Sequence, residues 1–265
     1  MEMLTSVQNP LVKQLAGLKE KKGRDGTGLF LIEGVRFVEE ALGAGAEIVQ
    51  VVYSPRLTQG ERGCRLLESF GKVKIPVLSV SEKVLAHVAD TETPQGIAAA
   101  VRIPQVSLDK LNGELFLIVD EVQDPGNLGS IIRSSLAAGA GGVVCTRGTV
   151  DAYNPKTLRS TMGAVFGLPV VQGIMVEELL QWLSERWIPL VVADSAGDNI
   201  YYESKLIPPL ALVIGNEGQG PNRLMLENAA LKIRIPLYGR VESLNAAVAA
   251  ALLLFESARQ AASRP

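Results

Sequence analysis

Two fully apolar runs, each followed by a turn rich in Gly and Asn, constrain the fold of this chain most. They occupy residues 115–119 and 210–214. Such runs, when turn residues bound them, are typical of strands buried on both faces of a parallel sheet. After the first run, Leu128, Ile131, Ile132 and Leu136 recur at helical spacing. The sequence therefore predicts an α/β fold with a mostly parallel sheet in its C-terminal part.

The turn after the first run brings two polar side chains to a strand end. Asn127 and Arg133 stand at the start of the helix that the apolar spacing predicts. In open α/β sheets, ligands bind at the carboxyl ends of the strands, so both residues are candidates for a site. Taken alone, they are equally compatible with a helix cap and a solvated helix residue.

Two further strand–loop–helix junctions follow the same plan. The second run leads into residues 215–221, whose three glycines permit positive φ and close approach of a ligand to the backbone. A strand at residues 232–237, ended by Pro236, leads to a long helix over residues 246–262. Ser243 or Asn245 can cap that helix.

In this order and spacing, the three junctions resemble the three signature motifs of the SpoU/TrmH family of RNA ribose 2′-O-methyltransferases. That family belongs to the wider group of knotted S-adenosylmethionine-dependent methyltransferases. The resemblance runs from about residue 115 to the end of the chain. Residues 154–164 are similar to the family's middle region, although they also fit a helix with a cationic face.

The resemblance implies a set of functional residues. The implied catalytic residues are Asn127, Arg133, Glu217, Ser243 and Asn245. The implied contacts to the cofactor S-adenosylmethionine are Val213, Ile214, Gly215, Glu217, Ile235, Pro236, Leu244 and Asn245. The family's other polar positions are all present.

Arg133 matches the family's catalytic arginine. An arginine is protonated at ordinary pH, so a bidentate grip on the target phosphate is easier to support than proton abstraction, which the family's mechanism also offers. Such a grip would orient the 2′-hydroxyl and stabilise the developing alkoxide. We expect Glu217 to orient Arg133 through an ion pair.

A break in the pattern near residues 103–113 predicts two domains, at residues 1–105 and 106–265. The first reads as a small α/β unit, with strands near residues 29–32, 48–53, 77–80 and 97–101 and helices near 35–42 and 62–70. Residues 30–36 and 93–98 resemble the L30e-like RNA-binding domain that precedes the catalytic domain in many SpoU-type rRNA methyltransferases.

The charge distribution suggests where RNA could bind. The net charge is −2, yet the first 24 residues contain a modest basic patch beside Gly23 and Gly26, which suggest a mobile segment. Phosphate contacts fit this patch, although a solvated helix end fits as well. The predicted RNA-binding residues are Lys19, Lys21, Lys22, Arg24, Lys156 and Arg159.

Several kinds of site are disfavoured. The single histidine, His87, lies outside every motif, and Cys64 and Cys145 belong to no C-x-x-C pair, so neither a catalytic triad nor a metal site is expected. A P-loop and a G-x-G-x-x-G fingerprint are missing. No apolar run is long enough to span a membrane and no secretory signal is visible, so we expect a cytoplasmic protein.

The sequence thus predicts a homodimeric, trefoil-knotted enzyme that methylates RNA ribose 2′-hydroxyls with S-adenosylmethionine. The accessory domain favours 23S rRNA over tRNA as the substrate. A tRNA 2′-O-methyltransferase and a non-catalytic RNA-binding module with the same knot are alternatives, and the intact polar residues argue against the second. A dehydrogenase with a doubly wound sheet is disfavoured by the missing glycine fingerprint.

Overall fold

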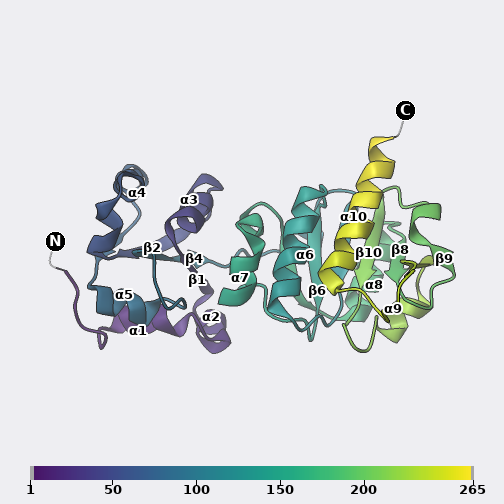
Figure 1. Ribbon diagram of the computed structural model, residues 1–265, viewed down its shortest axis with the longest axis horizontal. Coiled ribbons are helices and arrows are strands. Elements are labelled where there is room, and N and C mark those ends of the chain that lie inside the picture. The colour runs from purple at the N-terminus through teal and green to yellow at the C-terminus, as the bar shows by residue number, and fades with distance from the viewer. Residues whose placement is uncertain (1–2, 264–265) are drawn as a thin grey trace. The chain divides into compact units, whose positions relative to one another are not determined.

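The computed structural model describes residues 3–263 and divides into two compact units (Figure 1). The N-terminal unit comprises the described residues up to Pro104 together with Tyr153–Leu158. The C-terminal unit comprises Gln105–Ala152 and the described residues from Arg159 onward. A later stretch of the chain, Tyr153–Leu158, therefore groups with the first unit, which a single cut at residue 105 does not anticipate.

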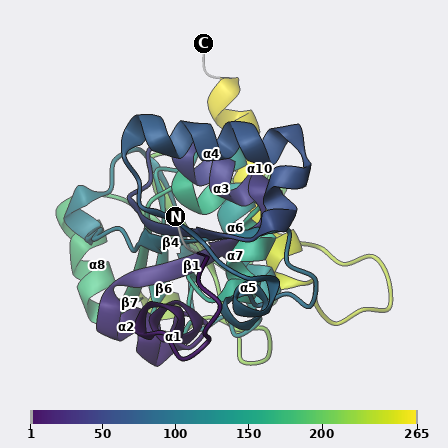
Figure 2. The ribbon, with the colours of Figure 1, turned by 90° about the vertical axis from the view of Figure 1, so that its left-hand side faces the viewer.

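The N-terminal unit is built on a four-stranded mixed sheet in the order β1-β4-β2-β3. Its strands are β1 (Leu29–Glu33), β2 (Ile48–Tyr53), β3 (Val77–Ser79) and β4 (Ile97–Arg102). Its helices are α1 (Pro10–Gly17), α2 (Lys21–Thr27), α3 (Val35–Gly43), α4 (Glu61–Val73) and α5 (Glu82–Val88). Helices α1 and α5 pack on one face of the sheet, and α3 and α4 lie on the opposite side (Figure 2).

The segment that the glycines suggested to be mobile is the helix α2. Gly23 is needed there because a Cβ at this position would lie 2.1 Å from the carbonyl oxygen of Gly17. Arg24 is buried, and its Nη1 donates to the carbonyl oxygens of Leu18 at 2.8 Å and Lys19 at 2.7 Å. Arg24 therefore joins α2 to the end of α1, which corrects its expected role as a phosphate contact.

The C-terminal unit contains a seven-stranded sheet in the order β7-β6-β5-β10-β8-β11-β9, in which every neighbouring pair is parallel. Its strands are β5 (Leu115–Val119), β6 (Gly142–Thr146), β7 (Val170–Ile174), β8 (Leu190–Ala193), β9 (Asn199–Ile200), β10 (Leu210–Ile214) and β11 (Leu231–Arg234). The two apolar runs are the adjacent central strands β5 and β10, both fully buried. The predicted parallel α/β fold is confirmed.

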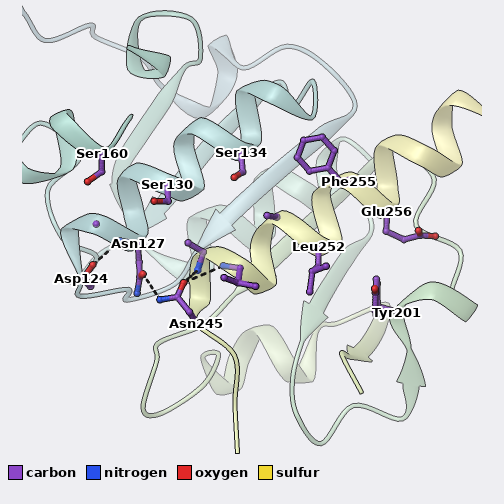
Figure 3. A pocket seen from close by; sticks show the side chains of 14 residues that line it. Asp124, Asn127, Ser130, Ser134, Ser160, Tyr201, Asn245, Leu252, Phe255 and Glu256 are labelled. Atoms are coloured by element: carbon purple, nitrogen blue, oxygen red, sulfur yellow. Dashed lines mark hydrogen bonds between the residues drawn. The ribbon is translucent and has the colours of Figure 1, made fainter. Parts of the chain in front are cut away.

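Helices cover both faces of this sheet. They are α6 (Pro125–Ala137), α8 (Val176–Glu185), α9 (Arg223–Glu227) and α10 (Ala246–Ala262), whereas most of α7 (Pro155–Thr161) belongs to the stretch that groups with the N-terminal unit. Phe116 and Trp182 meet edge to face, with ring centroids 5.2 Å apart, where α8 packs on the sheet. Helices α6 and α10 lie side by side on the other face (Figures 1 and 3).

The predicted apolar face of α6 is largely correct. Leu128, Ile131 and Ile132 are fully buried, whereas Leu136 at the end of the helix is exposed. The helix ends at Ala137, so Leu136 lies where the packed face runs out. Within residues 3–263, no helix has the length and apolar character to cross a membrane.

Candidate functional site

A chain of hydrogen bonds joins the three strand–loop–helix junctions. Asn127 donates from Nδ2 to Oε1 of Glu217 at 2.9 Å, and Asn245 donates from Nδ2 to Oδ1 of Asn127 at 2.8 Å. The backbone amide of Gln123 donates to the other carboxylate oxygen of Glu217 at 3.3 Å. Asn127 and Asn245 face each other at the starts of α6 and α10 (Figure 3). Three of the predicted catalytic residues thus meet at one place.

Helix capping fixes the two asparagines. Oδ1 of Asp124 accepts from the amide of Asn127 at 2.8 Å and caps α6. Oδ1 of Asn245 accepts from the amides of Ala247 at 2.9 Å and Val248 at 3.3 Å, so Asn245 caps α10. A cap of this kind stabilises a helix by about 1 kcal/mol. Asn245 therefore uses its oxygen for the helix and its nitrogen for Asn127.

A buried carboxylate that the sequence reasoning missed supports this network. Asp120 accepts from the Thr146 hydroxyl at 2.9 Å and from the amide of Asn222 at 2.7 Å. The next residue, Glu121, has a φ of +55°, and its carbonyl oxygen accepts from Nδ2 of Asn216 at 2.8 Å. These bonds join the ends of β5 and β6 to the loop after β10. The sequence feature that could have identified Asp120 is its position as a carboxylate directly after an apolar strand.

Glu217 is an ionised acceptor at this site. Partial burial opposes its ionisation, but hydrogen bonds from Asn127 and from the backbone amides of Glu217, Gln123 and Asp124 together lower the pKa of its carboxyl group. A carboxylate with a lowered pKa is a weak base, so Glu217 orients its partners in preference to accepting a proton.

The expected ion pair between Glu217 and Arg133 is wrong. The Glu217 oxygens accept from Asn127 and Gln123, and Arg133 projects from an exposed part of α6. Within residues 3–263 the Arg133 guanidinium makes neither a hydrogen bond nor an ion pair. The structure therefore leaves this cation available to an external anion.

A small pocket of about 140 Å³ lies beside β11 and the loop that precedes α10. It is lined by Ala193, Asp194, Ser195, Ile233, Ile235, Leu237, Glu242, Ser243, Leu244 and Ala249. The predicted residues Ile235, Ser243 and Leu244 are among them. Asp194 and Ser195 were missed, although their position directly after an apolar strand is a signal of the kind already used.

The side chains of this pocket fit S-adenosylmethionine. Aliphatic groups suit an adenine ring, and the Asp194 and Glu242 carboxylates and the Ser195 and Ser243 hydroxyls suit a ribose and a cationic donor. The cofactor has no phosphate, and the pocket has no cationic side chain among its lining residues. Of the other expected contacts, Val213 and Ile214 are buried in β10 and Pro236 is not among the lining residues.

Gly215 has a different reason for being glycine than the one predicted. Its φ lies outside the left-handed region, and among the three glycines of its loop only Gly220 has a positive φ, at +74°. A Cβ on Gly215 would lie 2.3 Å from the backbone nitrogen of Pro221 and 2.5 Å from the carbonyl carbon of Gly220. Gly215 therefore permits the loop to fold back on itself.

We expect Gly215→Ala to destabilise the protein by about 1–3 kcal/mol, because the backbone of residues 220–221 must move away from the new Cβ. Chemical denaturation measures this loss. Gly218→Ala is the matched control in the same loop: its Cβ would meet only Oδ1 of Asn216 at an ordinary 3.6 Å. Equal stability of the two variants would contradict the packing explanation.

A larger groove of about 920 Å³ lies between α6 and α10 (Figure 3). Its lining combines polar groups with exposed apolar side chains. The lining residues are Asp124, Gly126, Asn127, Ser130, Ser134, Ser160, Tyr201, Asn245, Ala247, Val248, Ala251, Leu252, Phe255 and Glu256.

The predicted RNA-binding residues differ in their surroundings. Lys21 and Lys22 are exposed on α2, whereas Lys19 donates from Nζ to the carbonyl oxygens of His87 at 2.9 Å and Ala89 at 3.3 Å. Lys156 and Arg159 are exposed on α7. Among the RNA contacts expected near the N-terminus, Lys21 and Lys22 therefore have the side chains with the fewest hydrogen bonds to other described residues of the chain.

The parallel sheet with polar loops at one edge defines an α/β protein with a ligand site at its strand ends. The family model for the SpoU rRNA Methylase family matches residues 114–255, and the model for the MRM3-like substrate binding domain matches residues 9–99. The chain belongs to the SpoU rRNA methylase family. This confirms the family that the three motifs indicated.

Several relatives and solved structures extend over nearly the whole chain. The chain is 37% identical over 255 residues to the Bacillus subtilis 23S rRNA (guanosine(2553)-2′-O)-methyltransferase RlmP, covering 96% of this chain and 98% of the relative. It is 31% identical to the Streptomyces viridochromogenes 23S rRNA (uridine(2479)-2′-O)-methyltransferase, with coverages of 93% and 87%.

The structure is similar to that of the SpoU methyltransferase AviRb from Streptomyces viridochromogenes in complex with the cofactor AdoMet. The TM-score is 0.90 at 30% identity, covering 97% of this chain and 100% of that one. An AdoMet-bound rRNA methyltransferase from Sinorhizobium meliloti matches with a TM-score of 0.86 at 34% identity, covering 97% of each chain. The fold of this chain therefore agrees with the folds of two AdoMet-bound methyltransferases over nearly its whole length.

Proposed function

We infer that this protein is an S-adenosylmethionine-dependent RNA methyltransferase that methylates a ribose 2′-hydroxyl of 23S rRNA. The observation that carries the inference is the meeting of Asn127, Glu217 and Asn245 at the strand ends of a family-type sheet. The choice of rRNA over tRNA follows the names of the Bacillus subtilis and Streptomyces viridochromogenes relatives, both of which are 23S rRNA methyltransferases.

When bound, S-adenosylmethionine supplies an electrophilic methyl group. Ile235, Ser243 and Leu244, with Asp194 and Glu242, would hold it in the small pocket. Arg133 would bind the phosphate next to the target ribose, orient the 2′-hydroxyl and stabilise negative charge on its oxygen as the hydroxyl proton passes to solvent water. Glu217 would keep Asn127 and Asn245 in position for the ribose.

Isothermal titration of the full chain tests this proposal. S-adenosylhomocysteine should bind and NAD should not, which separates the methyltransferase from a dehydrogenase. Incubation with ribosomal RNA and S-adenosylmethionine, followed by mapping of 2′-O-methyl sites, then separates an enzyme from a non-catalytic RNA-binding module. Cofactor binding without methylation of any rRNA or tRNA would contradict the proposed activity.

We propose that the N-terminal unit holds the RNA, with Lys21 and Lys22 in contact with phosphates. Changing both lysines to glutamine should lower the salt dependence of RNA binding, because each lost phosphate contact reduces the slope by roughly one unit. Filter binding at several salt concentrations measures the slope. Lys13→Gln with Lys72→Gln is a charge-matched control from exposed positions on α1 and α4. Equal slopes in both double variants would exclude Lys21 and Lys22.

We also propose that the C-terminal segment forms the trefoil knot of the family. The loop after β8 lies close over β11: a Cβ on Gly197 would be 2.7 Å from the carbonyl carbon of Ile233. Nη1 of Arg234 donates to the carbonyl oxygens of Gly197 at 2.7 Å and Asp198 at 2.9 Å. After β11 the chain runs directly beside this loop on its way to α10. This course supports a path in which the C-terminal segment threads through the loop.

A second copy of the chain is the occupant that we propose for the groove between α6 and α10. Val248, Leu252 and Phe255 are exposed apolar residues along one helix, and a homodimer would remove them from water. Sedimentation velocity should give about twice the chain mass of 28.3 kDa. We also propose that the enzyme is cytoplasmic, because its proposed substrate is ribosomal RNA.

A further inference from the structure

An exposed pair of tyrosines connects two segments that line the small pocket. The hydroxyl oxygens of Tyr202 and Tyr238 are 2.9 Å apart and share a hydrogen bond. Tyr202 is 44% exposed and Tyr238 is 87% exposed. A side chain as exposed as that of Tyr238 has little packing to hold it in place, so its hydrogen bond to Tyr202 is the interaction that fixes its position.

Tyr202 belongs to the well-anchored side of this contact. It follows β9, whose residues pair with Ile233 and Arg234 of β11. The Tyr201 and Tyr202 rings meet edge to face with centroids 5.1 Å apart, and the Ser204 hydroxyl donates to the carbonyl oxygen of Ile200 at 2.7 Å. The segment between β8 and β9 provides Asp194 and Ser195 to the pocket.

Tyr238 belongs to the weakly anchored side. Residues 236–244 contribute Leu237, Glu242, Ser243 and Leu244 to the pocket. Within residues 3–263, the bond to Tyr202 is the only hydrogen bond that residues 236–244 make. A single hydrogen bond, together with the packing of Leu237 and Leu244, therefore holds this wall against the rest of the unit, and Figure 2 shows the stretch before α10 as a wide loop.

The size of the pocket gives this contact a role. Its volume of about 140 Å³ is below the roughly 300–1,000 Å³ that is usual for pockets that enclose a small-molecule ligand. A molecule as large as S-adenosylmethionine must displace one of the walls to enter. The wall formed by residues 236–244 makes a single hydrogen bond within the described part of the chain, so it is the wall with the least to hold it in place.

Resting on the proposed function, we propose that Tyr202 and Tyr238 are positioning residues whose hydrogen bond holds residues 236–244 over the cofactor pocket. The bond breaks when S-adenosylmethionine enters or S-adenosylhomocysteine leaves, and it re-forms as the loop closes. The pair therefore controls the rate of cofactor exchange and the placement of Ser243 and Leu244 in the pocket.

Three variants isolate the hydroxyl contact from the rings: Tyr202→Phe, Tyr238→Phe and the double variant. Stopped-flow binding of S-adenosylhomocysteine should show dissociation accelerated about 3- to 10-fold, as expected for one neutral hydrogen bond. The double variant should match either single variant, because each change removes the same bond. Tyr53→Phe, in β2 of the N-terminal unit, is the control and should leave the rates unchanged.

Limited proteolysis gives a readout on the protein alone. Arg240 is exposed within residues 236–244, and trypsin should cleave after it several-fold faster in Tyr238→Phe than in the wild type. Arg240→Gln removes the site and identifies the fragment. Cleavage should slow in the wild type when S-adenosylhomocysteine is added.

The outcomes separate this proposal from others. Unchanged dissociation and unchanged cleavage in Tyr238→Phe would overturn it. If Tyr238→Phe is normal but Tyr238→Leu loses RNA affinity, the ring stacks on an unpaired base and the proposal is also wrong. If the wild type binds no S-adenosylhomocysteine, the proposed function fails, and unchanged tryptic cleavage in Tyr238→Phe would independently overturn the contact's role in closing the loop.

Discussion

Arg133→Ala should bind S-adenosylmethionine almost normally and lose methyl transfer by about 10²–10³-fold, the usual loss for one preorganised charge stabiliser. The reason is that Arg133 lies outside the pocket, is exposed, and is the cation we assign to the target phosphate. Single-turnover kinetics at saturating RNA isolate the chemical step.

Two controls sharpen the result for Arg133. Arg133→Lys should restore little activity, because an ammonium group cannot make the planar two-point contact of a guanidinium with a phosphate. Arg223→Ala removes an exposed arginine from α9 and should leave the chemical step unchanged. Turnover close to the wild-type value in Arg133→Ala would mean that this arginine is an ordinary solvated helix residue.

Leu244→Arg should reduce S-adenosylhomocysteine affinity by at least about 100-fold while the fold is kept. Leu244 lines the small pocket, and the longer arginine side chain would occupy space that the ligand needs. A 100-fold loss corresponds to about 2.8 kcal/mol of binding free energy, since each 1.4 kcal/mol is a factor of ten in affinity. Isothermal titration measures the loss.

Leu224→Arg is the matched control for this change. Leu224 is 38% exposed and Leu244 is 37% exposed, but Leu224 lies on α9 and is not among the residues of the pocket. Both variants should unfold at nearly the wild-type temperature, and only Leu244→Arg should lose the ligand. Equal affinities would remove Leu244 from the cofactor site.

The sequence was most informative where apolar runs have sharp boundaries. The predicted strands at residues 115–119 and 210–214 and the predicted helix at residues 246–262 coincide with β5, β10 and α10. Helix α4 extends beyond its predicted ends, to Glu61–Val73, because its ends are mostly polar or glycine and apolar spacing does not mark them. Helix α2 escaped prediction, since its glycines and charges are stabilised by a contact with the end of α1 that local composition does not reveal.

The residues of the site were likewise predicted only in part. The resemblance named Asn127, Glu217 and Asn245, and the structure brings them together. It did not identify Asp120, because a buried carboxylate depends on partners from two other loops. The separation of Glu217 from Arg133 likewise depends on tertiary contacts, and spacing along the chain gives no distance between such side chains.

The bonds of Asn127 have a consequence for the order in which the molecule assembles. Its partners Glu217 and Asn245 are 90 and 118 positions further along the chain. Contacts at such separations form late, because the intervening chain must be ordered first. On dilution from denaturant, helical signal should therefore recover before ligand binding does. A refolding population would pass through a stage that has most of its secondary structure and as yet no functional centre.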